Sequence, residues 1–108
     1  MAYFLLQGAY TAEAWKALVK KPHDRTEVVR PVIEKLGGRM ESAWFAFGEY
    51  DIVLILQMPD NVSAAAFSLA VAAGGAFKSY KTTPLMTIAD GIEAMRKAAG
   101  AGYQPPSS

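Results

Sequence analysis

Three side chains between residues 40 and 60 are suited to holding a small molecule, because they bring polar groups into two largely apolar segments. They are Ser42, Trp44 and Gln57. Ser42 and Trp44 are two residues apart, so an extended chain places them on the same face. Apolar walls with a few polar groups are typical of small-molecule sites, and an indole ring can stack on an aromatic ligand. The competing interpretation is that these side chains pack against a partner subunit, and the residues alone leave both open.

A tyrosine and an aspartate, Tyr50 and Asp51, stand side by side between the two runs. A phenol next to a carboxylate can position a proton donor and a proton acceptor for acid–base work. In the alternative interpretation, Asp51 accepts hydrogen bonds from turn amides and Tyr50 packs on a neighbour, which is a widespread use of such residues in turns.

The only histidine, His23, lies in the polar segment 20–24 beside Pro22. Its imidazole could act as a general base or a metal ligand, whereas the plainer interpretation is a solvated loop residue. One histidine without any cysteine does not supply a protein-built zinc site, so no metal is expected.

Composition narrows the function classes further. The 108 residues carry a formal net charge of +1, which gives no electrostatic reason to expect nucleic acid or an anionic membrane as a partner. The absence of cysteine excludes disulfides and a cysteine nucleophile. No phosphate-binding loop, nucleophile elbow or paired-carboxylate motif is present, so no cofactor is expected. The chain has neither signal-peptide features nor an apolar run of roughly 18 residues, and a cytoplasmic location is the simplest expectation.

The candidate residues must be positioned by two strands joined at the turn Gly48–Asp51, because aromatic and β-branched residues flank that turn. If Gly48 faces Asp51, then Phe47 faces Ile52, Trp44 faces Ile55, and Ser42 faces Gln57. One face then holds only apolar side chains: Ala43, Phe45, Phe47, Ile52, Leu54 and Leu56. The other face holds Ser42, Trp44, Ala46, Val53, Ile55 and Gln57. We expect the first face to lie under helices.

The remaining pattern predicts the elements around this hairpin. A first strand spans 2–10, Thr11 caps a short helix, and a second helix starts near residue 24 or 26 and ends at the glycines 37–38. A third helix runs from Asp60 or Asn61 to about residue 73. Residues 77–86 form an edge strand, because Pro84 and alternating lysines suit an edge. Thr87 caps a last helix with Ile88, Ile92 and Met95 on one face. We assign residues 1–99 to one domain and 100–108 to a flexible tail.

This order, strand–helix–strand–strand–helix–strand plus a last helix, predicts an α+β fold of the ferredoxin-like type. Helices cover only one face of such a sheet, yet the opposite face here carries Trp44, Val53 and Ile55. The same face of a second subunit is the simplest cover, which predicts a homo-oligomer built as a dimeric α/β barrel.

A short motif supports this fold. An aromatic strand is followed by Gly48-Glu49-Tyr50-Asp51, then by the apolar run 52–56 and Met58-Pro59-Asp60. This arrangement resembles the GYD-domain family, named for a Gly-x-Tyr-Asp element. The resemblance spans residues 3–87 and implies a ferredoxin-like, dimeric α/β-barrel fold. The family's members largely lack an assigned function, so the resemblance implies no particular activity.

The first strand adds two further candidate ligand-binding residues. Its alternation puts Tyr3 and Gln7 on the face of Trp44 and Gln57, and we expect the two glutamine amides to point into one enclosure. Our first hypothesis is a small homo-oligomeric binding or accessory protein with an apolar cavity between sheets, holding a small apolar or aromatic ligand. The second is a cofactor-independent enzyme, such as a monooxygenase, isomerase or decarboxylase. The third is a structural assembly module.

Overall fold

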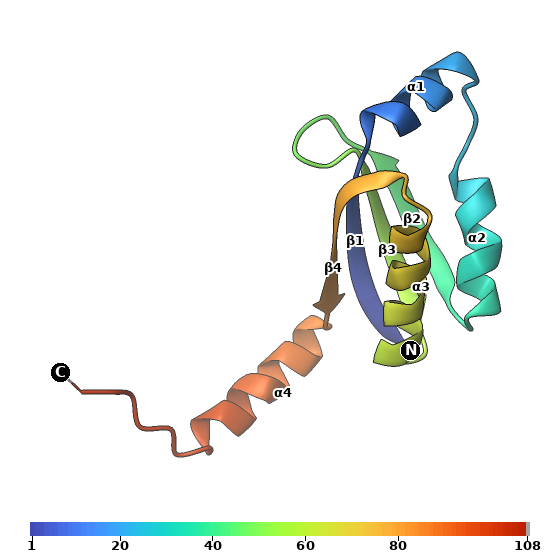
Figure 1. Cartoon of the computed structure of the whole chain (residues 1–108). Coiled ribbons are helices and arrows are strands. Elements are labelled where there is room, and N and C mark those ends of the chain that lie inside the picture. The colour runs from blue at the N-terminus through green and yellow to red at the C-terminus, as the bar shows by residue number, and fades with distance from the viewer. Residues whose placement is uncertain (108) are drawn as a thin grey trace.

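The structure is a computed structural model and describes residues 1–107. A four-stranded antiparallel sheet forms its centre (Figure 1). The strand order is β2–β3–β1–β4. The strands are β1 (Ala2–Tyr10), β2 (Arg39–Phe45), β3 (Ile52–Met58) and β4 (Phe77–Leu85). The helices are α1 (Ala12–Lys20), α2 (Thr26–Lys35), α3 (Asn61–Ala73) and α4 (Ile88–Ala99). The predicted α+β, ferredoxin-like order is confirmed, with β4 at an edge of the sheet.

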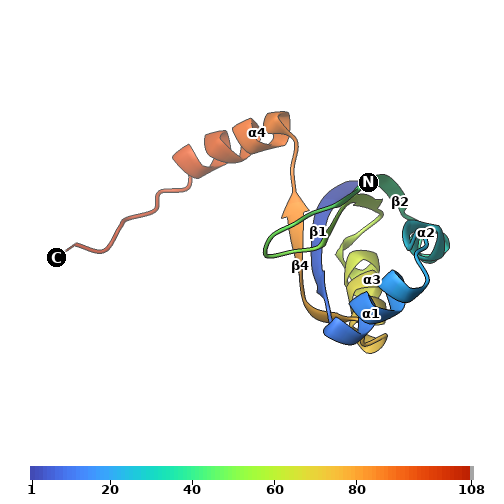
Figure 2. The same cartoon turned by 90° about the horizontal axis from the view of Figure 1, so that it is seen from above.

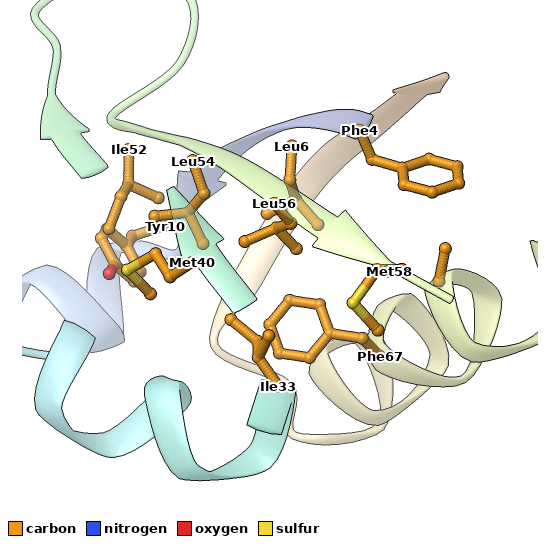
Figure 3. Packing of buried hydrophobic residues seen from close by; sticks show 11 residues of the cluster. Phe4, Leu6, Tyr10, Ile33, Met40, Ile52, Leu54, Leu56, Met58 and Phe67 are labelled. Atoms are coloured by element: carbon orange, nitrogen blue, oxygen red, sulfur yellow. The ribbon is translucent and has the colours of Figure 1, made fainter. Parts of the chain in front are cut away.

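Helices α1, α2 and α3 lie on one side of the sheet, as the view in Figure 2 shows. The side chains that point toward them from β1 and β3 are buried, among them Phe4, Leu6 and Leu54. Ile33 from α2 and Phe67 from α3 reach into the same cluster (Figure 3). The predicted assignment of β1 and β3 faces is therefore confirmed, because their alternation follows the period of two along a strand.

The predicted pairing of the hairpin is wrong by two residues. Ile52 pairs with Phe45 rather than Phe47, and Trp44 pairs with Val53 rather than Ile55. Ser42 pairs with Ile55, and a β-bulge lies just before it, between Met40 and Ser42. A shift of two preserves the face of each paired residue, because side chains alternate with that period.

The cause of the shift is a longer loop than expected. Residues 46–51 connect the strands instead of a four-residue turn. Two backbone bonds hold this loop closed: Ala46 N donates to Asp51 O at 2.8 Å, and Asp51 N donates to Gly8 O at 2.8 Å. Phe47, expected under the helices, is fully exposed in the loop. Phe45 is also largely exposed, at the outer edge of β2.

Side-chain caps begin three of the helices at the expected residues. Thr11 Oγ1 accepts a hydrogen bond from Ala14 N at 3.0 Å, and Thr87 Oγ1 accepts one from Asp90 N at 3.1 Å. Asp60 Oδ1 accepts one from Ser63 N at 2.7 Å. These bonds satisfy amides that have no partner within the helix. Residues 101–107 follow α4 without a helix or strand.

The Asp60 cap predicts a pH dependence of stability. The hydrogen bond from Ser63 N lowers the pKa of Asp60 below its usual 3.8. A lowered folded-state pKa adds stability that is present above 3.8 and is lost as the pH falls below that value. We expect Asp60→Asn, which retains a capping oxygen, to reduce the loss of stability between pH 5 and about pH 2.5, because the asparagine does not titrate. Urea unfolding across this range checks it, and an unchanged pH dependence would contradict it.

Candidate functional site

The face of the sheet opposite α1, α2 and α3 is the first candidate site, and we call it the open face. Its centre consists of Leu5, Val53 and Ile55, which are apolar and only half-buried. Toward its rim, Trp44 is 66% exposed and Tyr3 is 37% exposed. No helix of the described chain lies over this face (Figure 2). Apolar surface of this kind costs free energy in water.

The two glutamines lie on the open face but not together. Gln57 pairs with Tyr3, whereas Gln7 pairs with Val53 and Lys81. Four residues along β1 separate the two positions, which corresponds to about 13 Å at the rise of a strand. The two amides therefore occupy opposite ends of the face and are too far apart to hydrogen-bond to each other, although the sequence predicted that they point into one enclosure.

Gln57 belongs to a polar cluster at its end of the face. Its Nε2 donates to Glu41 Oε1, which also accepts from Arg39 Nε at 3.0 Å and Nη2 at 2.7 Å. These bonds, from Arg39 first and Gln57 second, lower the pKa of the Glu41 carboxyl. The β-bulge next to Ser42 sets this geometry, because it adds an unpaired residue, Glu41, to β2. A ligand group at this end would meet the Glu41 carboxylate, which already accepts hydrogen bonds from Arg39 and Gln57.

A second polar group of residues lies at the opposite end of the face. Tyr50, Gln7 and Lys81 border an open hollow of about 460 Å³ together with loop residues 46–49. Tyr50 lies near Gln7 because Asp51 N is bonded to Gly8 O, which draws the loop onto β1. From the sequence, Lys81 could bind an anion, but the favoured interpretation is that alternating lysines protect an edge strand. Only its pairing with Gln7 across the β1–β4 ladder brings its ammonium group here.

Asp51 connects the hairpin loop to two other elements. Its Oδ2 accepts a hydrogen bond from Tyr10 N at 2.9 Å and from Trp15 Nε1 at 3.2 Å. The carboxylate accepts a backbone amide, as expected for a structural role, but that amide lies at the end of β1 rather than in the turn. The carboxylate therefore joins the loop to β1 and α1, whereas Tyr50 borders the hollow on the open face.

The ring of Tyr10 is packed next to this carboxylate. It stacks on Phe77 with ring centroids 4.6 Å apart and meets Trp15 edge-on at 5.2 Å. Burial raises the pKa of the Tyr10 phenol, which Asp51 also raises and Arg25 lowers. Burial and stacking at the ends of β1, α1 and β4 indicate a structural use for this cluster.

His23 lies apart from the open face, in a cleft between the α1–α2 connection and the edge strand β2. Its Nδ1 is 3.0 Å from the carbonyl oxygen of Lys21. The cleft has a volume of about 740 Å³, and its lining includes Arg25, Arg30, Ser42 and Trp44. Trp44 and Ser42 thus border both the cleft and the open face, because β2 is the outermost strand on that side.

Within residues 1–107, no cluster of three or more histidine, cysteine, aspartate or glutamate side chains is arranged to hold a metal ion. His23 accordingly belongs to no such group of three. In the same range, no helix has the length and apolar character needed to span a membrane.

Comparison with known families decides the classification. The profile described as "GYD domain" matches residues 4–95, which is most of the chain. The chain belongs to the GYD domain family. In this GYD domain, the aspartate of the Gly-x-Tyr-Asp element fastens the hairpin loop to β1 and α1, and its tyrosine borders the hollow.

Structural comparison agrees with the fold. The structure described as "crystal structure of FFRP-DM1" aligns with this GYD domain with a TM-score of 0.51 and 13% sequence identity. The alignment covers 80% of this chain and 100% of that chain. At this identity the likeness concerns the fold alone. No curated protein matches the sequence.

Proposed function

We propose that this GYD domain is a homo-oligomeric binding protein, in which the open faces of two copies meet and enclose a small, mostly apolar molecule. The uncovered centre of the sheet carries the proposal. Leu5, Val53 and Ile55 are half-exposed on a face that no helix of the described chain covers. Full burial of such a side chain stabilises by about 1.5–3 kcal/mol, and covering these partly buried side chains adds the remaining part of it. A second copy supplies a matching apolar face by symmetry.

The chemistry of the rim indicates the ligand class. Trp44 offers an aromatic face on which a planar ring can stack. At one end of the face, Gln7, Tyr50 and Lys81 provide hydrogen-bond donors. We therefore infer a small aromatic or apolar molecule with one or two polar groups, the polar end lying toward Gln7 and Lys81. Ser42, Tyr3 and Gln57 contribute to the same enclosure.

The hollow also supports a second candidate function, a cofactor-independent enzyme. Tyr50 and Lys81 are ionisable groups beside an apolar surface, where a phenol or ammonium group can transfer a proton. The two functions differ in the expected behaviour of Tyr50→Phe. In a binding protein, this variant should retain the same ligand as the wild type. In an enzyme, it should accumulate substrate that the wild type converts. An assembly module would hold neither.

The oligomer is tested by replacing Ile55, at the centre of the open face, with aspartate. A charge in a buried apolar interface costs several kcal/mol, so we expect the dissociation constant to rise about 100-fold or more. Val28→Asp is the matched control, because it places the same charge on the exposed side of α2. Sedimentation velocity over a concentration series measures both variants. A wild-type monomer, or equal dissociation of both variants, would overturn the open-face assembly.

The ligand is tested by native mass spectrometry of protein purified from its own host. We expect a retained small molecule in the wild-type oligomer, and its loss or strong reduction in Trp44→Ala with the oligomer intact. A bare oligomer from the host would contradict the binding function and leave assembly as the role of the face.

A further inference from the structure

Within residues 1–107, no helix or strand packs closely on helix α4. None of its residues is buried, and its apolar side chains Ile88, Ile92 and Met95 are exposed. The spacing of four and three residues places these side chains on one stripe of the helix. An isolated helix of 12 residues is marginal in water, so a helix with such a stripe requires a surface to pack on.

The shape of the molecule reflects this lack of contact. Its radius of gyration is 17.5 Å and its longest extent is 57 Å. A compact domain of this length has a radius of gyration of about 13 Å. Both views show the cause, since α4 leaves the end of β4 and projects away from the body, and residues 101–107 continue outward beyond it (Figures 1 and 2).

The direction of α4 identifies the side on which its partner lies. In Figure 2, α4 extends on the side of the sheet opposite α1, α2 and α3, which is the side of the open face. Leu85 and Met86, at the junction of β4 and α4, are exposed apolar residues. Leu85 pairs with Tyr3 at the rim of the open face. An apolar surface thus continues from the open face along the junction to the stripe of α4.

We infer that α4 is an exchanged arm, whose stripe packs on a second copy of this chain seated on the open face. The inference rests on the proposed face-to-face assembly. Two packed sheets lie about 10 Å apart, and a helix of 12 residues is about 18 Å long. The arm therefore runs past the sheet of the second copy to the level of its helices.

The size of the interface supports this occupant. A four-stranded face with strands of seven residues has a flat footprint of about 440 Å² at standard strand spacings. Stable interfaces bury about 800 Å² of accessible surface per partner, which exceeds this flat footprint. Two exchanged arms add their stripes to the buried surface. The two arms would also close the space between the two sheets along the edge formed by β4.

The charges of α4 favour a protein partner over an anionic membrane. Asp90 and Glu93 balance Arg96 and Lys97, so the helix has no net charge from these groups. Membrane-surface helices are typically rich in lysine and arginine on their polar face. Glu93 and Arg96 are moreover paired with each other at 3.2 Å.

A charge on the stripe tests the arm in the full-length chain. We expect Ile92→Asp to weaken the dimer at least tenfold, as the loss of one buried isoleucine predicts. Ala94→Asp is the matched control, because residue 94 lies away from the stripe of the same helix. Sedimentation velocity gives both dissociation constants. Equal constants for Ile92→Asp and wild type would overturn the exchanged arm while leaving the face-to-face dimer in place.

Mixed samples decide which copy receives the arm. The chain has no cysteine, so Ala98→Cys carries a single spin label beside the stripe. Labelled copies are mixed with ¹⁵N-enriched wild-type copies, and we expect amide signals of the enriched copies to broaden. Broadening seen only when label and isotope share one chain would show that α4 folds back onto its own sheet, and would overturn the exchange. If Ile55→Asp leaves the dimer intact, the open-face assembly fails, and the exchange of α4 across that face fails with it.

Discussion

Replacing Gly38 with alanine is expected to lower the free energy of unfolding by about 3 kcal/mol, the upper end of the usual cost of overpacking a core. Gly38 follows α2 and leads directly into β2. A methyl group at this position would lie 2.6 Å from the carbonyl oxygen of Gln57 and 3.2 Å from Ile33 Cγ2, and it would overlap Met58 Sδ. Ile33 and Met58 are fully buried, so neither can move aside without displacing the core. The backbone of β3 cannot move without breaking its ladder. Urea unfolding monitored by circular dichroism measures the loss.

Gly48 provides the control for this substitution. A methyl group at Gly48 would meet no atom within 4 Å, and its backbone φ is not positive. We expect Gly48→Ala to change stability by less than about 0.5 kcal/mol. The first residue of the Gly-x-Tyr-Asp element is thus not required for the backbone of this loop. Similar losses for both alanine variants would contradict the close-approach explanation for Gly38.

Replacing Asp51 with alanine is expected to cost about 2–3 kcal/mol of stability. The variant removes the acceptor of the Tyr10 amide, and Tyr10 is buried, so water does not readily replace the carboxylate. It also removes the acceptor of the Trp15 indole. Asp51→Asn should lose only about 1 kcal/mol, because an amide oxygen can still accept one of these bonds. Trp15 fluorescence should respond to both variants.

Glu49, in the same loop, provides the control for a general effect of substitution in this loop on stability. Glu49 is exposed and makes no side-chain hydrogen bond in the described structure, so Glu49→Ala should leave stability within about 0.5 kcal/mol of wild type. If Asp51→Ala kept full thermal stability but lost a retained ligand, the aspartate would be a binding or catalytic group and the structural assignment would be wrong.

The sequence by itself determined the elements and their order. Thr11, Asp60 and Thr87 begin helices where expected, because a cap bonds to an amide only three residues away. The buried faces of β1 and β3 follow from alternation along a single strand. The four-strand order then follows from the few topologies that short connections permit. These features depend on neighbours in the chain, so the residues along the chain suffice to predict them.

Only the tertiary structure decided how those elements meet. The six-residue loop shifted the hairpin pairing by two, and one of its two closing bonds joins Asp51 N to Gly8 O on another strand. The β1–β3 register separated Gln7 from Gln57, and the β1–β4 register brought Lys81 beside Gln7. The amide partner of the Asp51 carboxylate lies 41 residues earlier in the chain. Such contacts between distant segments depend on the register in which neighbouring strands pair. The alternation of side chains along one strand does not fix that register, because a shift by any even number of residues leaves every side chain on the same face.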